Sequence, residues 1–165
     1  MTRVGILGGT FDPIHNGHLA LADAATKSLS LEKVIFIPAY IPPHKERSDI
    51  ASSEDRYNMV MLAVSENNRY TASSFEIDKK GRSYSIDTLK HLKKTYPQDT
   101  QFFFLIGSDS LKELHTWKDI DKLVKICRFA AAGRPGYSLI GHYKGEIVKI
   151  DMPPTEISST AIRQA

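Results

Sequence analysis

Short runs of apolar residues alternate along this chain with segments of helical periodicity. Four of the runs have apolar side chains at consecutive positions rather than at every second one: Val4–Leu7, Val34–Ile37, Phe102–Ile106 and Phe129–Ala132. Continuous runs of this kind are typical of strands that are covered on both faces, as in parallel sheets. Strands that alternate with helices indicate an α/β layer architecture with right-handed crossovers. We therefore predict a parallel sheet with helices on both faces.

The segments between these runs complete the predicted order of elements. We expect helices at 18–29, from 53 onward, from 84 towards 96 and at 123–126, a short strand or strand pair at 70–77, a strand at 147–150, and a last helix capped by residues 156–160. Met59, Leu62 and Ala63 are the expected inner face of the second helix. The sequence contains no internal repeat and no inter-domain linker, so residues 1–165 are predicted to form one domain.

Composition limits the classes of protein that this chain can belong to. Hydrophobic residues make up 41% and charged residues 25% of the 165 positions, as in an ordinary globular domain. A net charge of +3 without a dense Lys/Arg stripe favours a small anionic ligand over a nucleic acid. The single cysteine, Cys127, cannot form an internal disulfide, which is typical of a reducing compartment. Because no apolar stretch approaches the length of a membrane span, we expect a cytoplasmic protein without a membrane partner.

The strongest functional signal follows the first predicted strand, in the sequence Gly8-Gly9-Thr10-Phe11-Asp12-Pro13-Ile14-His15-Asn16-Gly17-His18. Ligands of open α/β sheets bind beyond the carboxyl ends of the strands, where this segment lies. Gly8 and Gly9 let backbone N–H groups approach an anion, because no Cβ stands in the way. His15 just before the predicted helix and His18 in its first turn can converge on a phosphate at the helix N-terminus.

Common nucleotide-binding and metal-binding motifs fit this segment less well. The glycines do not match a G-x-G-x-x-G dinucleotide fingerprint, and no Gly-Lys-Ser/Thr follows the strand as a Walker A loop requires. A metal site formed by Asp12, His15 and His18 is an alternative, although the H-x-x-H spacing lacks the glutamate of metalloproteases. A purely structural role is the weaker interpretation of two histidines that follow a glycine-rich loop.

This segment resembles the H-x-G-H signature of the nucleotidylyltransferase superfamily, which is related in fold to class I aminoacyl-tRNA synthetases. At the far end of the chain, residues 157–163 (Ile-Ser-Ser-Thr-Ala-Ile-Arg) resemble the second signature of that superfamily. The resemblance implies a Rossmann-like, doubly wound parallel sheet with His15 and His18 as catalytic residues. It also implies ATP contacts at Gly8, Gly9, Thr10, Phe11, His15, His18, Gly107, Asp109, Ser158, Ser159, Thr160 and Arg163. Taken alone, residues 158–163 fit an ordinary helix N-cap and a solvated arginine equally well.

Features in the middle of the chain resemble bacterial nicotinate mononucleotide adenylyltransferases. They are the Pro42-Pro43-His44-Lys45 loop, the helix start at residues 83–89, the Gly107-Ser108-Asp109 turn and the lone Trp117. The resemblance implies that Trp117 stacks on the pyridine ring, that Thr88 meets its carboxylate and that Asp109 touches ribose. It assigns acceptor binding to His44, Lys45, Tyr84, Thr88 and Trp117. From the residues alone, the proline-rich loop also fits a solvated surface loop, and Trp117 the edge of a core.

Together these features imply adenylyl transfer from ATP to nicotinate mononucleotide, which gives nicotinate adenine dinucleotide and pyrophosphate. Mg²⁺ is expected on the ATP phosphates, without a metal site of protein ligands. Phosphopantetheine adenylyltransferase, which shares the H-x-G-H turn, is the first alternative, and a non-catalytic nucleotide-binding module is the second. We expect no nucleic-acid partner, and the sequence leaves open whether copies of the chain form a homo-oligomer. Because the family pattern continues beyond the two residues after Arg163, we expect the last helix to be cut short.

Overall fold

The computed structural model describes residues 2–11, 13–40, 51–81, 83–133, 139, 143 and 145–152, without the side chains of Ser108 and Asp109. The strands are β1 (Arg3–Gly9), β2 (Lys33–Pro38), β3 (Tyr70–Ala72), β4 (Gln101–Ile106), β5 (Cys127–Gly133) and β6 (Ile147–Asp151). The helices are α1 (Asn16–Leu29), α2 (Ser53–Val64), α3 (Phe75–Lys79), α4 (Ser85–Thr95), α5 (Ser108–Glu113), the 3₁₀ helix η1 (Leu114–Thr116) and α6 (Ile120–Leu123). None of these described helices is long and apolar enough to cross a membrane.

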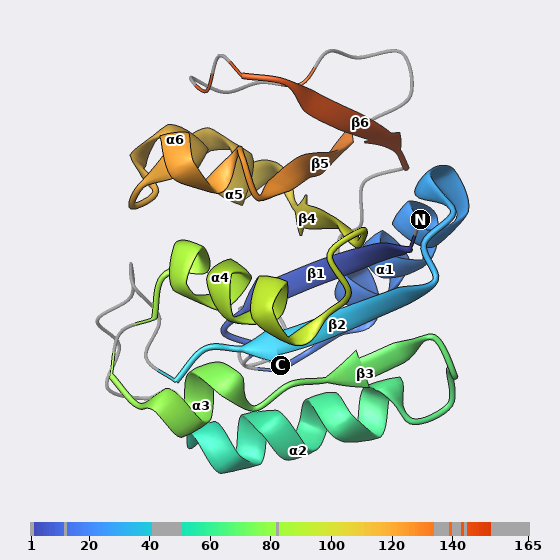
Figure 1. Ribbon diagram of the computed structural model, residues 1–165. Coiled ribbons are helices and arrows are strands. Elements are labelled where there is room, and N and C mark those ends of the chain that lie inside the picture. The colour runs from blue at the N-terminus through green and yellow to red at the C-terminus, as the bar shows by residue number, and fades with distance from the viewer. Residues whose placement is uncertain are drawn as a thin grey trace.

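The described strands form one sheet in the order β3-β2-β1-β4-β5-β6, and every neighbouring pair is parallel. Figure 1 shows β3 and β6 at opposite edges of this sheet. The chain moves outward from β1 to β3 and then returns to place β4 on the other side of β1. This reversal is the switch point of a doubly wound sheet, so the predicted Rossmann-like fold is confirmed.

Two apolar clusters cover the two faces of the sheet. One cluster joins α1 and α2 to the strands through residues such as Leu21, Ala25 and Val60. The other joins α4, α5 and α6 to the opposite face, through residues such as Leu89 and Leu111. Figure 1 shows α1 and α4 on opposite sides of the strands. Because both faces are covered, the strand residues are apolar at consecutive positions, as the sequence predicts.

Two predicted elements differ in the structure. The strand expected at 70–77 ends at Ala72, and residues 75–79 form α3 instead. The ladder stops after the Ser73 N–H donates to the Phe36 carbonyl oxygen, and the Phe75 ring then stacks on His91 of α4 with centroids 4.0 Å apart. The helix expected at 123–126 lies earlier, at 120–123, and is followed by a turn. Contacts with other elements therefore determine where both helices lie: Phe75 stacks on α4, and Ile120 and Leu123 join the core cluster on the same face of the sheet.

The predicted inner face of α2 is wrong at Leu62, whereas Met59 and Ala63 are half-buried. Leu62 is 75% exposed, whereas Arg56, Val60 and Val64 are buried. These three residues are spaced four apart and therefore share one face of the helix. Their pattern was hidden in the sequence because the first of the three carries a charge, and charged residues are seldom buried.

The orientation of α2 can be tested by the stability of two variants. Val60→Ala should lower the free energy of unfolding by about 2 kcal/mol, because it removes buried methyl groups and leaves a cavity. Leu62→Ala should change it by less than about 0.5 kcal/mol, because the side chain is solvated. Urea denaturation of both variants measures the difference. A larger loss for Leu62→Ala would mean that the helix is rotated relative to this structure.

Candidate active site at the carboxyl edge of the sheet

The turn between β1 and α1 lies where the order of the strands reverses. β1 pairs with β2 on one side and with β4 on the other, so its carboxyl end borders the crevice where open α/β sheets bind ligands. Gly8 and Gly9 belong to β1 itself rather than to the turn, because they pair with Ile37 and Pro38 of β2. The turn therefore begins at Thr10.

His15 and His18 form a reciprocal cap at the start of α1. The Gly17 N–H donates to Nδ1 of His15 at 3.0 Å, and the His15 N–H donates to Nδ1 of His18 at 3.1 Å. The two rings stack with their centroids 3.9 Å apart and their planes at 27°. The structure thus brings the two imidazoles together at the N-terminus of α1, where the sequence placed them.

The cap determines which ring nitrogen faces a ligand. Because Nδ1 of each histidine accepts a hydrogen bond, a neutral ring carries its proton on Nε2. Neither of the cap's two hydrogen bonds uses an Nε2–H group. The first turn of α1 contains no acidic residue, so its own side chains do not neutralise the positive end of the helix dipole. The pair therefore offers neutral donors and a positive helix end to an anion.

Burial keeps both imidazoles uncharged. The pKa of His18 falls to about 4, first because burial penalises the charged ring and second because His15 is adjacent. Burial also lowers the pKa of His15. Protonation of either Nδ1 would replace an acceptor by a donor and break the cap. Both rings are therefore neutral at neutral pH in the ligand-free protein.

Phe11 supports the histidine pair from within the core. The side chain is 2% exposed, and its ring meets the His18 ring edge-to-face with centroids 4.9 Å apart. Its φ of 51° lies in the left-handed region, which is uncommon for a bulky residue. Phe11 is a predicted ATP-binding residue. Because its side chain is buried, only its backbone is available to contact a nucleotide.

Gly107 directly follows β4, on the other side of the point where the strand order reverses. It is the N-cap residue of α5, and a Cβ placed on it would meet no atom of the described residues within 4 Å. Among the described residues, none fills the space beside this strand end. Asp109 lies in α5, but its side chain is outside the described part of the structure. Since β4 neighbours β1, Gly107 and the histidine pair follow adjacent strands.

Tyr84 and Trp117 are packed against the same apolar cluster on the α4 face of the sheet. Tyr84 is the N-cap residue of α4, and Trp117 directly follows η1. The Lys118 ammonium lies 4.6 Å over the Tyr84 ring, which makes a cation–π contact. The Trp117 ring is half-buried and meets Phe104 of β4 edge-to-face at 5.3 Å. Lys118 was not predicted as a site residue, although its position next to Trp117 was a usable signal.

Thr88 is 2% exposed, and both of its donors are used inside the protein. Its hydroxyl donates to the Glu76 carboxylate at 2.6 Å, and its N–H donates to the Tyr84 carbonyl oxygen at 3.3 Å. Burial raises the pKa of Glu76, and the hydrogen bond from Thr88 partly offsets that rise. Thr88 therefore ties α3 to α4 in this arrangement, and its contact with a ligand carboxylate stays a prediction. Glu76 was missed because α3 was not predicted.

Several predicted residues lie outside the described part of the chain. They are His44, Lys45, Ser158, Ser159, Thr160 and Arg163, together with Asp12 of the alternative metal site. Among the residues that the structure describes, no three His, Cys, Asp or Glu side chains gather as a protein metal site would require.

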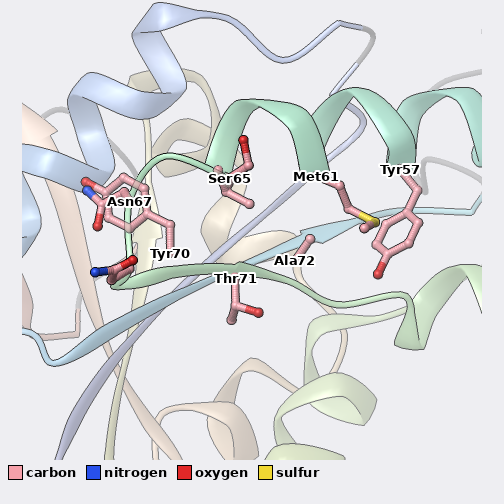
Figure 2. Close-up of a pocket in the computed structure, with 9 residues that line it drawn as sticks. Tyr57, Met61, Ser65, Asn67, Tyr70, Thr71 and Ala72 are labelled. Atoms are coloured by element: carbon pink, nitrogen blue, oxygen red, sulfur yellow. The ribbon is translucent and has the colours of Figure 1, made fainter.

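A separate hollow of about 400 Å³ lies between α2 and the edge strand β3. Figure 2 shows Tyr57 and Met61 of α2 on one side of it, and Thr71 and Ala72 of β3 on the other. None of the predicted site residues lines this hollow. It contains no paired titratable groups that could act on a substrate, so we do not include it in the candidate site.

Comparison with known proteins identifies the family of this chain. Residues 6–165 match the cytidylyltransferase-like family. Probable nicotinate-nucleotide adenylyltransferases of Thermoanaerobacter sp. (strain X514) and Halalkalibacterium halodurans are both 44% identical to this chain. The alignments cover 98% and 99% of this chain, and 82% and 79% of the two relatives.

Solved structures share the fold at lower identity. The nicotinic acid mononucleotide adenylyltransferase of Plasmodium falciparum complexed with NaAD superposes with a TM-score of 0.76 at 19% identity, over 99% of this chain and 83% of that one. A putative nicotinate-nucleotide adenylyltransferase from Vibrio parahaemolyticus gives 0.70 at 14% identity, over 99% and 80% of the chains. The sequence relatives and the shared fold agree, and the chain belongs to the cytidylyltransferase-like family and, within it, to the nicotinate-nucleotide adenylyltransferases.

Proposed function

We propose that this chain transfers the adenylyl group of ATP to nicotinate mononucleotide, which gives nicotinate adenine dinucleotide and pyrophosphate. The observation that carries the proposal is the histidine pair at the start of α1, beside the ends of β1 and β4. Family membership supports it, because relatives 44% identical over nearly the whole chain are named for this activity. A neighbour of the same fold was solved with NaAD, the product of such a transfer.

The proposed reaction depends on position and charge stabilisation. The attacking phosphate oxygen of the acceptor is already ionised at neutral pH, so no general base is needed. It forms a bond to the α-phosphorus of ATP while the bond from that phosphorus to the leaving pyrophosphate oxygen breaks. The Nε2–H groups of His15 and His18 donate to phosphoryl oxygens during this exchange. Because each Nδ1 is held in the helix cap, these donors are oriented before the substrate arrives.

Mg²⁺ enters this proposal on the phosphates of ATP, where it neutralises charge on the departing pyrophosphate. The donor set on the protein fits that arrangement. Both Nδ1 atoms of the histidine pair are used in the cap, and the described residues gather no set of three metal-ligating side chains. In this proposal the ion is held through phosphate and water oxygens. His15 and His18 then contact the nucleotide rather than the metal.

The acceptor side of the proposed site lies around Tyr84 and Trp117. A half-buried indole can stack on a pyridine ring, and the Lys118 ammonium places a positive charge beside the same surface. Phosphopantetheine has no ring to stack, so these side chains favour nicotinate mononucleotide as the acceptor. The remaining contacts stay predictions from the sequence: His44 and Lys45 with the mononucleotide, Asp109 with ribose, and Ser158, Ser159, Thr160 and Arg163 with ATP.

Replacement of His18 tests the catalytic role. His18→Ala should lower kcat by about 10²- to 10³-fold, because it removes a donor aimed at the reacting phosphate. The same change also removes the acceptor of the helix cap. His18→Gln is therefore the matched control, because glutamine at this position can accept the same backbone hydrogen bond. The glutamine variant should regain the stability of the wild type but not its turnover, as measured by pyrophosphate release. Recovery of turnover in that variant would assign His18 to capping alone.

The lowered pKa of His18 predicts a pH-dependent stability. Its value of about 4 in the folded protein lies below 6.5, so the unfolded chain binds a proton that the folded protein excludes. The free energy of unfolding should therefore fall by roughly 2 kcal/mol between about pH 6.5 and about pH 5. Urea denaturation of the ligand-free protein measures this loss. His18→Gln should lose much less stability over the same range, and an equal loss in both proteins would contradict the assignment.

The acceptor can be identified by two measurements on the wild type. Nicotinate mononucleotide should quench the fluorescence of Trp117, the single tryptophan of the chain, whereas phosphopantetheine should not. Pyrophosphate release from ATP with Mg²⁺ should then be fastest with nicotinate mononucleotide among three acceptors, the others being nicotinamide mononucleotide and phosphopantetheine. Release with phosphopantetheine alone would favour the first alternative. No release with any acceptor, despite ATP binding, would favour a non-catalytic module.

A further inference from the structure

Arg56 of α2 is a buried arginine at the carboxyl edge of the sheet. Its side chain is 1% exposed, and four of its hydrogen bonds end on backbone carbonyl oxygens. Burial of a guanidinium group is costly unless its N–H groups are satisfied. The position of these four acceptors shows what this residue holds together.

The acceptors belong to three separate stretches of chain. Nη1 donates to the carbonyl oxygens of Thr10 at 2.9 Å and of Ala39 at 2.5 Å. Nη2 donates to the Tyr40 oxygen at 2.9 Å, and Nε donates to the Ala51 oxygen at 2.9 Å. One planar group therefore joins the turn after β1, the chain that leaves β2 and the chain that enters α2.

The guanidinium continues the pairing of β1 with β2 beyond the last rung of the ladder. In that rung the Ala39 N–H donates to the Gly9 carbonyl oxygen at 2.9 Å. The next two carbonyl groups, of Thr10 and Ala39, both accept from Nη1 of Arg56. Two carbonyl oxygens cannot hydrogen-bond each other, so a donor between them is needed to hold the two chains at this separation.

We propose that Arg56 is a positioning residue that fixes the spacing between the turn after β1, which leads to the histidine pair, and the chain that leaves β2. It contacts neither substrate and acts through the backbone at Thr10, Ala39 and Tyr40. The effect on turnover rests on the proposed adenylyl transfer, in which two bound phosphate groups must meet with correct geometry. The effect on the backbone does not depend on that reaction.

The shape of the side chain, and not only its charge, carries this role. A guanidinium presents five N–H donors in a rigid planar fork, so it can reach acceptors that lie in different directions. A lysine ammonium keeps the positive charge but donates from a single atom. Arg56→Lys therefore separates geometry from charge. Val60→Ala is the matched control for lost stability, because it removes buried methyl groups on the same face of α2.

Hydrogen exchange gives the readout that does not require turnover. In Arg56→Lys the Ala39 amide should exchange about tenfold faster or more, because the rung to Gly9 loses its support. Val60→Ala should leave this amide as protected as the rest of the sheet. If Arg56→Lys has no temperature range in which it is folded, Arg56→Gln takes its place. Unchanged protection of Ala39 in the folded variant would overturn the proposal.

Kinetics of the same proteins give the second readout. At a temperature where all variants are folded, Arg56→Lys should lower kcat by about 10²-fold, because a shift of about 1 Å between reacting groups has that effect. The Kd of ATP alone should change by less than about threefold, since each half of the site remains intact. Wild-type turnover in Arg56→Lys would also overturn the proposal. A wild type without adenylyl transfer would instead contradict the proposed function, and the exchange result would still decide the role of Arg56.

Discussion

β1 is hydrogen-bonded to a parallel strand on each of its edges, and the remaining architecture follows from this position. Parallel neighbours require crossovers, and right-handed crossovers bring each following helix back across a face of the sheet. The chain therefore leaves β1 and β4 at the same edge, and it enters α1 and α5 there. Helix N-termini and strand ends meet at this edge, which explains why groups that suit an anion gather there.

At this edge the two hydrogen bonds of the histidine cap determine both where α1 starts and which ring nitrogens of its histidines carry a proton. The reciprocal cap starts α1, and it also orients the rings of His15 and His18. Burial beside Phe11 lowers the pKa of His18, so the cap stays intact at neutral pH. A charged imidazole would attract phosphate more strongly, but it would lose its fixed orientation. The geometry therefore favours oriented neutral donors over mobile charged ones, which suits a reaction that depends on positioning.

Buried polar groups outside the crevice hold its parts in place. Arg56 joins the ends of β1 and β2 to the start of α2, and Glu76 joins α3 to α4 through Thr88. In each case a charged or titratable side chain bonds a group on a different element. Such contacts add specificity to an apolar core, because apolar packing alone tolerates small displacements that a hydrogen bond does not.

The local features of this protein could be predicted from its amino-acid sequence. Continuous apolar runs predicted the strands, and the spacing of His15 and His18 predicted a histidine pair at a helix start, because both patterns depend on residues a few positions apart. Residue types and order were also sufficient to indicate the family. The same local reasoning explains the errors, since residues 75–77 and Leu62 gave no sign of where they pack.

Contacts between groups far apart in the sequence could be identified only from the folded protein. The contact between Arg56 and Thr10 joins positions 46 residues apart, and the hydrogen bond of Thr88 with Glu76 joins two separate helices. Burial of Phe11 under His18 likewise depends on where β2 and α1 place their side chains. No periodicity encodes such pairs, because the free energy that fixes them comes from packing between elements that the chain brings together only on folding.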